Sequence, residues 1–165
     1  LQLTGRTGQA LLSLGRADEA LEKLRVAQAG GFNPPDIQRA FGLALVANGL
    51  YAEAERAIVD IPADSRGNLE LVQGYLLLER GADAPAEEAL RRFVDIRPTD
   101  PAALNLLATA VYRQQRYSES VALLERATDL DPANETWAAN LERARAALAA
   151  EGLASEAEST RAATN

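Results

Sequence analysis

The chain has 165 residues, a formal net charge of −7 and an apolar content of 47%, which fits one folded domain or one elongated array. This acidic balance argues against nucleic-acid binding through bulk electrostatics, because neutralising phosphates requires a basic face. The absence of cysteine and histidine removes disulfides, thiolate metal sites and the commonest general base near neutral pH. The longest apolar run, AFGLALVA from Ala40, is far shorter than the roughly 20 residues of a membrane-spanning helix.

Small residues recur at a nearly constant interval along the chain. One series is Gly8, Gly42, Gly74 and Ala108, spaced 34, 32 and 34 residues apart. Two further series keep this spacing, namely Ala20, Ala54, Ala86 and Ser120, and then Gly15, Gly49, Gly81 and Gln115. Self-similarity at such a period indicates a repeat architecture. We therefore divide the chain into units at about residues 1–34, 35–66, 67–100 and 101–134.

Each unit is predicted to form two amphipathic helices joined by a short turn. In the first unit, the first helix has the sequence LQLTGRTGQ, with two glycines and two threonines. Such a helix would be stabler against a preceding repeat, so we expect the chain to be a piece of a longer array. The second unit is two residues short, and its last helix is expected to end early, at DIPADS.

The first helix of the third unit has two candidate registers. The stripe of Leu69, Val72 and Leu76 is more apolar than the in-phase set. That in-phase set is Glu70, Gln73 and Leu77. A slip of one residue, absorbed in GADAP, therefore stays open as an alternative.

The fourth unit shows the helical pattern most clearly. Its apolar stripe follows the spacing i, i+3, i+4, i+7 of one helical face, at Leu104, Leu107, Ala108 and Val111. Asp100 is the expected N-cap of this helix, with Pro101 at the first helical position. Asn33 and Pro34 are expected to take the same two roles in the second unit.

The recurring glycines predict two different kinds of backbone environment. Gly15, Gly49 and Gly81 lie at turns between paired helices, where left-handed backbone angles are favoured. Gln115 occupies this place in the fourth unit and is expected to cost about 1 kcal/mol relative to glycine. The mid-helix series that begins with Gly8 is instead expected to allow close approach of the two helices in each unit.

The segment after the fourth unit is predicted to be a single capping helix. Trp137, Leu141, Ala144 and Leu148 form an apolar stripe opposite a charged face. A terminal repeat exposes its side to water unless such a helix covers it. We place the capping helix at residues 135–150. Residues 151–165 are expected to form a flexible tail, because they offer little apolar surface for ordering.

These features together resemble the tetratricopeptide repeat family, whose unit is a 34-residue helical hairpin. The fourth unit carries the family pattern at Leu104, Leu107, Ala108, Val111, Tyr117, Ser120, Leu124, Ala127 and Pro132. The resemblance extends over roughly residues 1–134. It implies an all-α, right-handed solenoid of about four hairpins followed by the capping helix. The alanine-rich and arginine-rich composition suggests a bacterial source.

The resemblance also implies where a partner would bind. In this family the first helices of the hairpins line a concave groove that holds partner peptides. Carried over by position, the candidate partner-binding residues are Arg39, Leu43, Tyr75, Asn105, Thr109, Tyr112, Arg113, Asn140 and Arg143. Arginine can pair with a carboxylate, asparagine can hydrogen-bond a peptide backbone, and tyrosine adds contact area. Asn105, Tyr112, Arg113 and Arg143 are therefore the strongest candidates.

No catalytic residue, cofactor site or metal site is predicted. The acid pair Glu87 and Glu88 and the pair Asp129 and Asp131 are interpreted as solvated helix faces or cap positions, and Ser120 has no histidine to activate it. The sequence thus predicts a non-enzymatic module that binds a protein or peptide partner, without nucleic acid, cofactor or membrane span.

Two other roles stay open at this point. One is a structural module that associates with further copies through its open N-terminal edge. The other is the regulatory or targeting part of a larger multidomain enzyme or envelope assembly factor. The expected location is the cytoplasm or periplasm of a bacterium, as a soluble protein.

Overall fold

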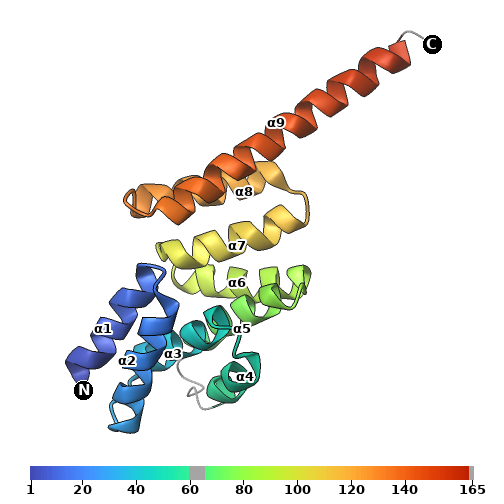
Figure 1. The fold of residues 1–165 in the computed structure, drawn as a ribbon. Coiled ribbons are helices and arrows are strands. Elements are labelled where there is room, and N and C mark those ends of the chain that lie inside the picture. The colour runs from blue at the N-terminus through green and yellow to red at the C-terminus, as the bar shows by residue number, and fades with distance from the viewer. Residues whose placement is uncertain (60–65, 164–165) are drawn as a thin grey trace.

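A computed structural model of the chain describes the backbone of residues 1–59 and 66–163, and the side chains of residues 1–59 and 69–155. Within these ranges the structure is helical and contains no strand. The helices are α1 (Gln2–Ser13), α2 (Ala17–Ala29), α3 (Pro35–Ala47), α4 (Tyr51–Val59), α5 (Arg66–Glu79), α6 (Asp83–Ile96), α7 (Pro101–Arg113), α8 (Tyr117–Leu130) and α9 (Glu135–Ala163). They form successive hairpins that stack into a solenoid, as predicted (Figure 1).

The turns between paired helices have the predicted left-handed geometry. Gly15, Gly49 and Gly81 have φ values of 74°, 71° and 73°. Gln115 has a φ of 63° and is the only described residue other than glycine with a positive φ. A left-handed conformation brings Cβ too close to the following carbonyl oxygen, so the glutamine is strained here.

We expect Gln115→Gly to raise the free energy of unfolding by about 1 kcal/mol, because glycine adopts this conformation without the steric penalty. The matched reverse substitution is Gly81→Gln, which places a side chain at a φ of 73° in the preceding hairpin. It should lower stability by a similar amount. Urea denaturation of both variants measures the two changes, and equal shifts of the same sign would contradict the explanation.

The mid-helix glycines mark close helix contacts, although not always within one hairpin. A Cβ atom on Gly8 would lie 2.7 Å from Leu24 Cγ, and one on Gly74 would lie 2.6 Å from Leu90 Cγ, so the prediction is confirmed for the first and third hairpins. A Cβ atom on Gly42 would instead lie 2.8 Å from Val72 Cγ1, on α5. At Gly42, α3 therefore lies closest to α5 rather than to its own partner α4.

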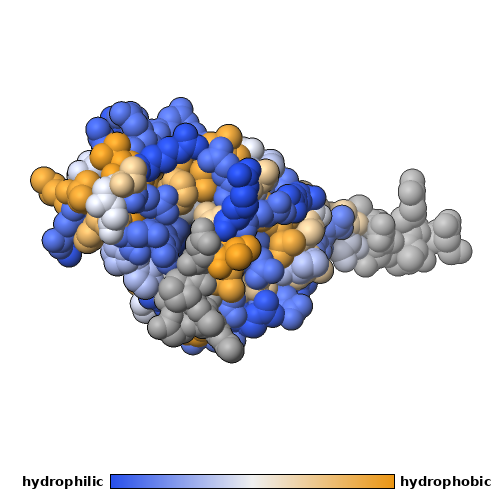
Figure 2. Space-filling view, turned by 90° about the horizontal axis from the view of Figure 1, so that it is seen from below, coloured by the Kyte–Doolittle hydropathy of each residue, from blue (hydrophilic) through white to orange (hydrophobic). Residues whose placement is uncertain are grey.

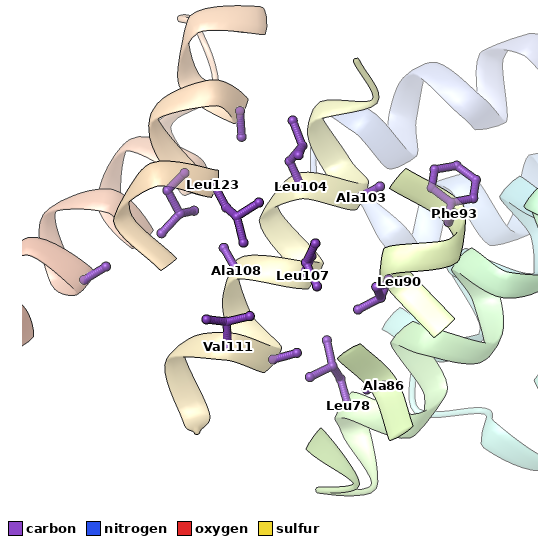
Figure 3. Close-up of a cluster of buried hydrophobic side chains, with 14 of the residues drawn as sticks. Leu78, Ala86, Leu90, Phe93, Ala103, Leu104, Leu107, Ala108, Val111 and Leu123 are labelled. Atoms are coloured by element: carbon purple, nitrogen blue, oxygen red, sulfur yellow. The ribbon is translucent and has the colours of Figure 1, made fainter. Parts of the chain in front are cut away.

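The core consists of two clusters that meet at α5. Val72 and Leu76 belong to the N-terminal cluster, whereas Leu71 and Leu78 belong to the C-terminal cluster. Figure 3 shows the C-terminal cluster, in which side chains of α7 lie between α6 and α8. α5 is buried on two sides. The stripe that contains Val72 and Leu76 is buried, as the slipped register predicted, while Gly74 keeps the contact with α6 that the in-phase register predicted. The helix therefore fits neither register alone.

The helix caps agree with the prediction at one of the two expected places. Asp100 Oδ1 accepts a hydrogen bond from the Ala103 amide at 3.1 Å, and the following proline opens α7. In the second unit, α3 begins one residue later than expected, with Pro34 at the N-cap. The prediction for Asn33 was therefore wrong, because two successive prolines shift the start. Its side chain instead accepts a hydrogen bond from Gln28 Nε2 at 3.3 Å.

The second unit and the C-terminus differ from the simple pattern. α4 is described as far as Val59, and the expected stop at DIPADS, residues 60–65, lies outside the described residues. α9 covers α8 with the buried residues Trp137, Leu141 and Ala144, as predicted. The helix then continues to Ala163 rather than ending near residue 150. The alanines and glutamates of this part favour helix by intrinsic propensity. Residues 164–165 lie outside the described part.

Candidate functional site

Five of the nine candidate binding residues come together on adjacent first helices. Asn105, Thr109 and Tyr112 lie on α7, and Asn140 and Arg143 lie on α9. We call this set the α7–α9 face. Its members are half-buried except for Arg143, which is exposed. Stacking places them together because equivalent positions of successive first helices lie side by side.

Hydrogen bonds link the polar members of the face. Asn140 Nδ2 donates to Asn105 Oδ1 at 2.7 Å, and Arg143 donates through Nη2 to Asn140 Oδ1 at 2.5 Å. The Thr109 hydroxyl donates to the Asn105 carbonyl at 2.9 Å, within α7. The two asparagines and the arginine thus form a connected line of polar groups across two helices.

The aromatic part of the face supports the arginine. The guanidinium carbon of Arg143 lies 5.8 Å from the ring centre of Tyr112, within the range of a cation–π contact. The Tyr112 ring in turn lies 5.2 Å from the ring of Tyr117, tilted by 60°. Among the described residues, the ion pairs of α9 involve Arg145 rather than Arg143. Arg143 is therefore held in place while its charge remains available to a carboxylate from outside.

A shallow depression lies beneath these side chains. It measures about 20 Å³ and is lined by Ala108, Thr109, Tyr112, Ser120, Leu124, Asn140 and Arg143. This volume holds about one water molecule. The buried Ser120 hydroxyl at its base donates to the Ala108 carbonyl at 2.9 Å, which fits a structural role for that serine. The face therefore suits surface contact with a polypeptide better than enclosure of a small molecule.

Arg113 is not part of this face. Its Nη1 donates to the Leu78 carbonyl at 2.5 Å and lies 3.4 Å from Asp83 Oδ1. The side chain is thus directed to the corner between α5 and α6. The structure separates Arg113 from Arg143, although the sequence pattern placed both in one site.

The candidate residues on α3 and α5 are engaged in internal contacts. Arg39 Nη1 lies 3.2 Å from Asp100 Oδ2, and both side chains are largely buried. Leu43 packs against both core clusters. Tyr75 is half-buried against the N-terminal cluster, and its pKa is raised by burial and by the charge of Glu79. These side chains contribute to folding more directly than to a binding surface.

A larger cavity lies in the irregular second unit and was not predicted. It has a volume of about 230 Å³ and is lined by Gln28, Asn33, Gln38, Phe41, Leu45, Glu53, Arg56 and Ala57. The buried Gln38 Oε1 has no hydrogen-bond partner among the described residues. The second unit is two residues short, which is the only sequence signal for this cavity, and most of the lining residues lie on α3 and α4.

The described residues contain neither a group of three acidic side chains placed to hold a metal ion nor a helix with the length and apolarity to cross a bilayer.

Comparison with known proteins identifies the fold. No protein-family model and no curated protein matches the chain. Among solved structures, it is similar to MamA 41-end from Desulfovibrio magneticus RS-1, with a TM-score of 0.56 and 23% sequence identity over 96% of this chain and 91% of that chain. The ArsTM double mutant of RS-1 MamA gives a TM-score of 0.54 and 22% identity, covering 97% and 95% of the two chains. MamA is a tetratricopeptide-repeat protein.

The chain has a tetratricopeptide-type fold. The tetratricopeptide arrangement accounts for the α7–α9 face, because it aligns successive first helices side by side. It also accounts for the conformation of Gln115, which takes the turn position that glycine holds in the other hairpins.

Proposed function

We propose that the protein is a non-enzymatic interaction module that binds an extended segment of a partner protein at the α7–α9 face. The observation that carries this proposal is the connected line of Asn105, Asn140 and Arg143 beside Tyr112. A tetratricopeptide-type fold supports a general role in protein interaction and does not specify the surface that is used.

The chemistry of the face favours a segment that carries an acidic residue. Asn105 and Asn140 can exchange their mutual hydrogen bond for bonds to a peptide backbone, so neither amide is left unsatisfied in either state. Arg143 can pair with a carboxylate, and Tyr112 supplies apolar contact and holds the guanidinium. Because these helices are already packed, the partner bears most of the cost of ordering. A dissociation constant in the micromolar range, or about 8 kcal/mol, is expected.

A library of acidic and neutral peptides, selected on the intact protein and ranked by calorimetry, tests this site. Arg143→Glu and Tyr112→Ala should each weaken the selected acidic peptides at least tenfold, or about 1.4 kcal/mol. The matched control is Arg126→Glu, which makes the same charge change on the exposed surface of α8. It should leave the affinity within about twofold. Selected peptides that bind both face variants and the control equally well would place the binding surface elsewhere.

A further inference from the structure

One ion pair joins hairpins that are not neighbours in the stack. Arg39 Nη1 on α3 lies 3.2 Å from Asp100 Oδ2, at the N-cap of α7, and the two residues are 61 positions apart in the chain. α5 packs against both α3 and α7, so the pair reaches past a whole first helix. In a solenoid each repeat normally contacts only its neighbours. A contact that skips one hairpin therefore restrains how the hairpin between is stacked.

The pair restrains geometry more than it stabilises the fold. The side chains of Arg39 and Asp100 are only 18% and 20% exposed. One guanidinium nitrogen makes the contact, and the buried Arg39 Nε has no hydrogen-bond partner among the described residues. Burying a charged group costs free energy that incomplete pairing does not offset, so such a pair often adds little net stability. What the contact does provide is a fixed position of α3 relative to α7.

Asp100 ties this contact to the start of α7. Its Oδ1 accepts the capping hydrogen bond from the Ala103 amide, while its Oδ2 faces Arg39, so the two oxygens have different partners. Ala103 belongs to the C-terminal core cluster, and Ala40, next to Arg39, belongs to the N-terminal cluster. The pair therefore connects the two clusters on the side of the first helices.

On the side of the second helices, the same junction differs from the two others. At those two junctions, neighbouring second helices are joined by an ion pair between residues 28 positions apart. These pairs are Arg25 with Glu53 and Arg91 with Glu119. Between α4 and α6 the equivalent positions hold Val59 and Pro85, which are exposed and apolar. Glu55 on α4 pairs instead with Arg80, in the turn after α5. Figure 2, seen from the end where α2 and α4 lie, shows separate apolar patches within a mostly hydrophilic surface.

We propose that the Arg39–Asp100 pair is a strap that sets the curvature of the solenoid, and that the junction between the second and third hairpins opens when the strap is released. The strap holds the first helices of the two halves together, so its release should move α3 away from α7. The distance between α1 and α9 should then increase, while each hairpin stays intact. The α7–α9 face lies entirely on the C-terminal side of this junction, so the strap does not depend on the proposed binding site.

Double electron–electron resonance between spin labels on α1 and α9 tests the strap. The chain contains no cysteine, so labels can be attached at Arg6→Cys and Ala139→Cys, two exposed positions outside the pair. Asp100→Asn is the main variant, because asparagine also serves as an N-cap but has no charge to pair with Arg39. The distance distribution should shift to longer distances and broaden. Circular dichroism should show unchanged helix content, which separates opening from unfolding.

Arg39→Met removes the other partner and leaves the cap of α7 untouched. It should give the same shift as Asp100→Asn, and the double variant should give no larger shift, because one and the same contact is lost in every case. Asp95→Asn is the matched control, since it makes the same change of charge on the exposed surface of α6. Its distances should match those of the labelled parent chain. Unchanged distances in both strap variants, shifts that add in the double variant, or an equal shift in Asp95→Asn would overturn the proposal.

Discussion

We expect Gly74→Ala to lower the free energy of unfolding by about 1 to 2 kcal/mol, although alanine is the better helix former. The new methyl group would lie 2.6 Å from Leu90 Cγ and 2.8 Å from Leu90 Cδ2. Leu90 is fully buried in the C-terminal cluster, so it has little room to move. Overpacking of a core typically costs about 1 to 3 kcal/mol, which outweighs the gain of about 1 kcal/mol in helix propensity.

Gly152→Ala is the matched control for this change. Gly152 also lies within a helix, but a Cβ atom there would meet no atom within 4 Å. The same substitution should therefore raise stability by up to about 1 kcal/mol. Denaturation with urea measures both variants at one pH.

A double-mutant cycle separates the steric cost from other effects. Leu90→Ala removes the side chain that the new methyl group meets, at a cost of its own. In that background Gly74→Ala should be neutral or stabilising, which gives a coupling energy of about 1 to 3 kcal/mol. If Gly74→Ala costs the same with and without Leu90, the close contact between α5 and α6 is not the cause.

The close helix contacts that could be predicted from sequence lie within one hairpin. Gly74 and Leu90 are 16 residues apart, as are Gly8 and Leu24, and a repeat fixes this separation. The contact of Gly42 with Val72 could not be predicted in this way. It joins α3 to the first helix of the next hairpin, and such a contact depends on how helices of different hairpins pack together.

The sequence placed nine candidate residues on one surface, and the structure brings five of them together. Their individual contacts could not be predicted. Periodicity places Asn105 and Asn140 at neighbouring positions of stacked helices, and they do form a hydrogen bond. Arg39 pairs with Asp100, which lies 61 residues away in the chain. Arg113 is adjacent in sequence to Tyr112 but reaches the Leu78 carbonyl instead. Long arginine side chains can reach several partners, so only the packed structure determines which one is used.

The length of α9 shows a different limit of sequence reasoning. The small apolar surface of residues 151–165 predicted a flexible tail, because burial usually stabilises helices. The helix nevertheless continues to Ala163, and residues 151–155 are exposed. Intrinsic propensity is therefore the available explanation for these turns.

Glu87 is the centre of an ion-pair network that joins α6 to α8. Its carboxylate lies 2.5 Å from Arg116 Nη2 and 2.8 Å from Arg91 Nη2, and it accepts a hydrogen bond from Gln114 Nε2 at 2.8 Å. Both arginines also pair with Glu119. The hydrogen bond from Arg116 is the main reason that the pKa of Glu87 is lowered to about 2, with Arg91 and Gln114 acting in the same direction.

This network should make the stability of the fold depend on acid pH. A carboxylate with a lowered pKa in the folded state stabilises that state above its unfolded pKa of 4.5, and the contribution is lost as the pH falls through about 2. Glu87→Gln should therefore lower the free energy of unfolding by about 1 to 2 kcal/mol at pH 7. The full shift would imply more, but water screens the two arginines.

Denaturation at pH 7 and near pH 2 separates this effect from a general loss of packing. The difference between the unmodified chain and Glu87→Gln should shrink towards zero at the lower pH, because Glu87 is then increasingly protonated and uncharged in both states. Glu88→Gln is the matched control, since Glu88 is the adjacent residue, is 76% exposed and pairs with Arg92 alone among the described residues. It should change stability by less than about 0.5 kcal/mol at either pH. A difference for Glu87→Gln that persists unchanged near pH 2 would show that the glutamate acts through its shape and not through its charge.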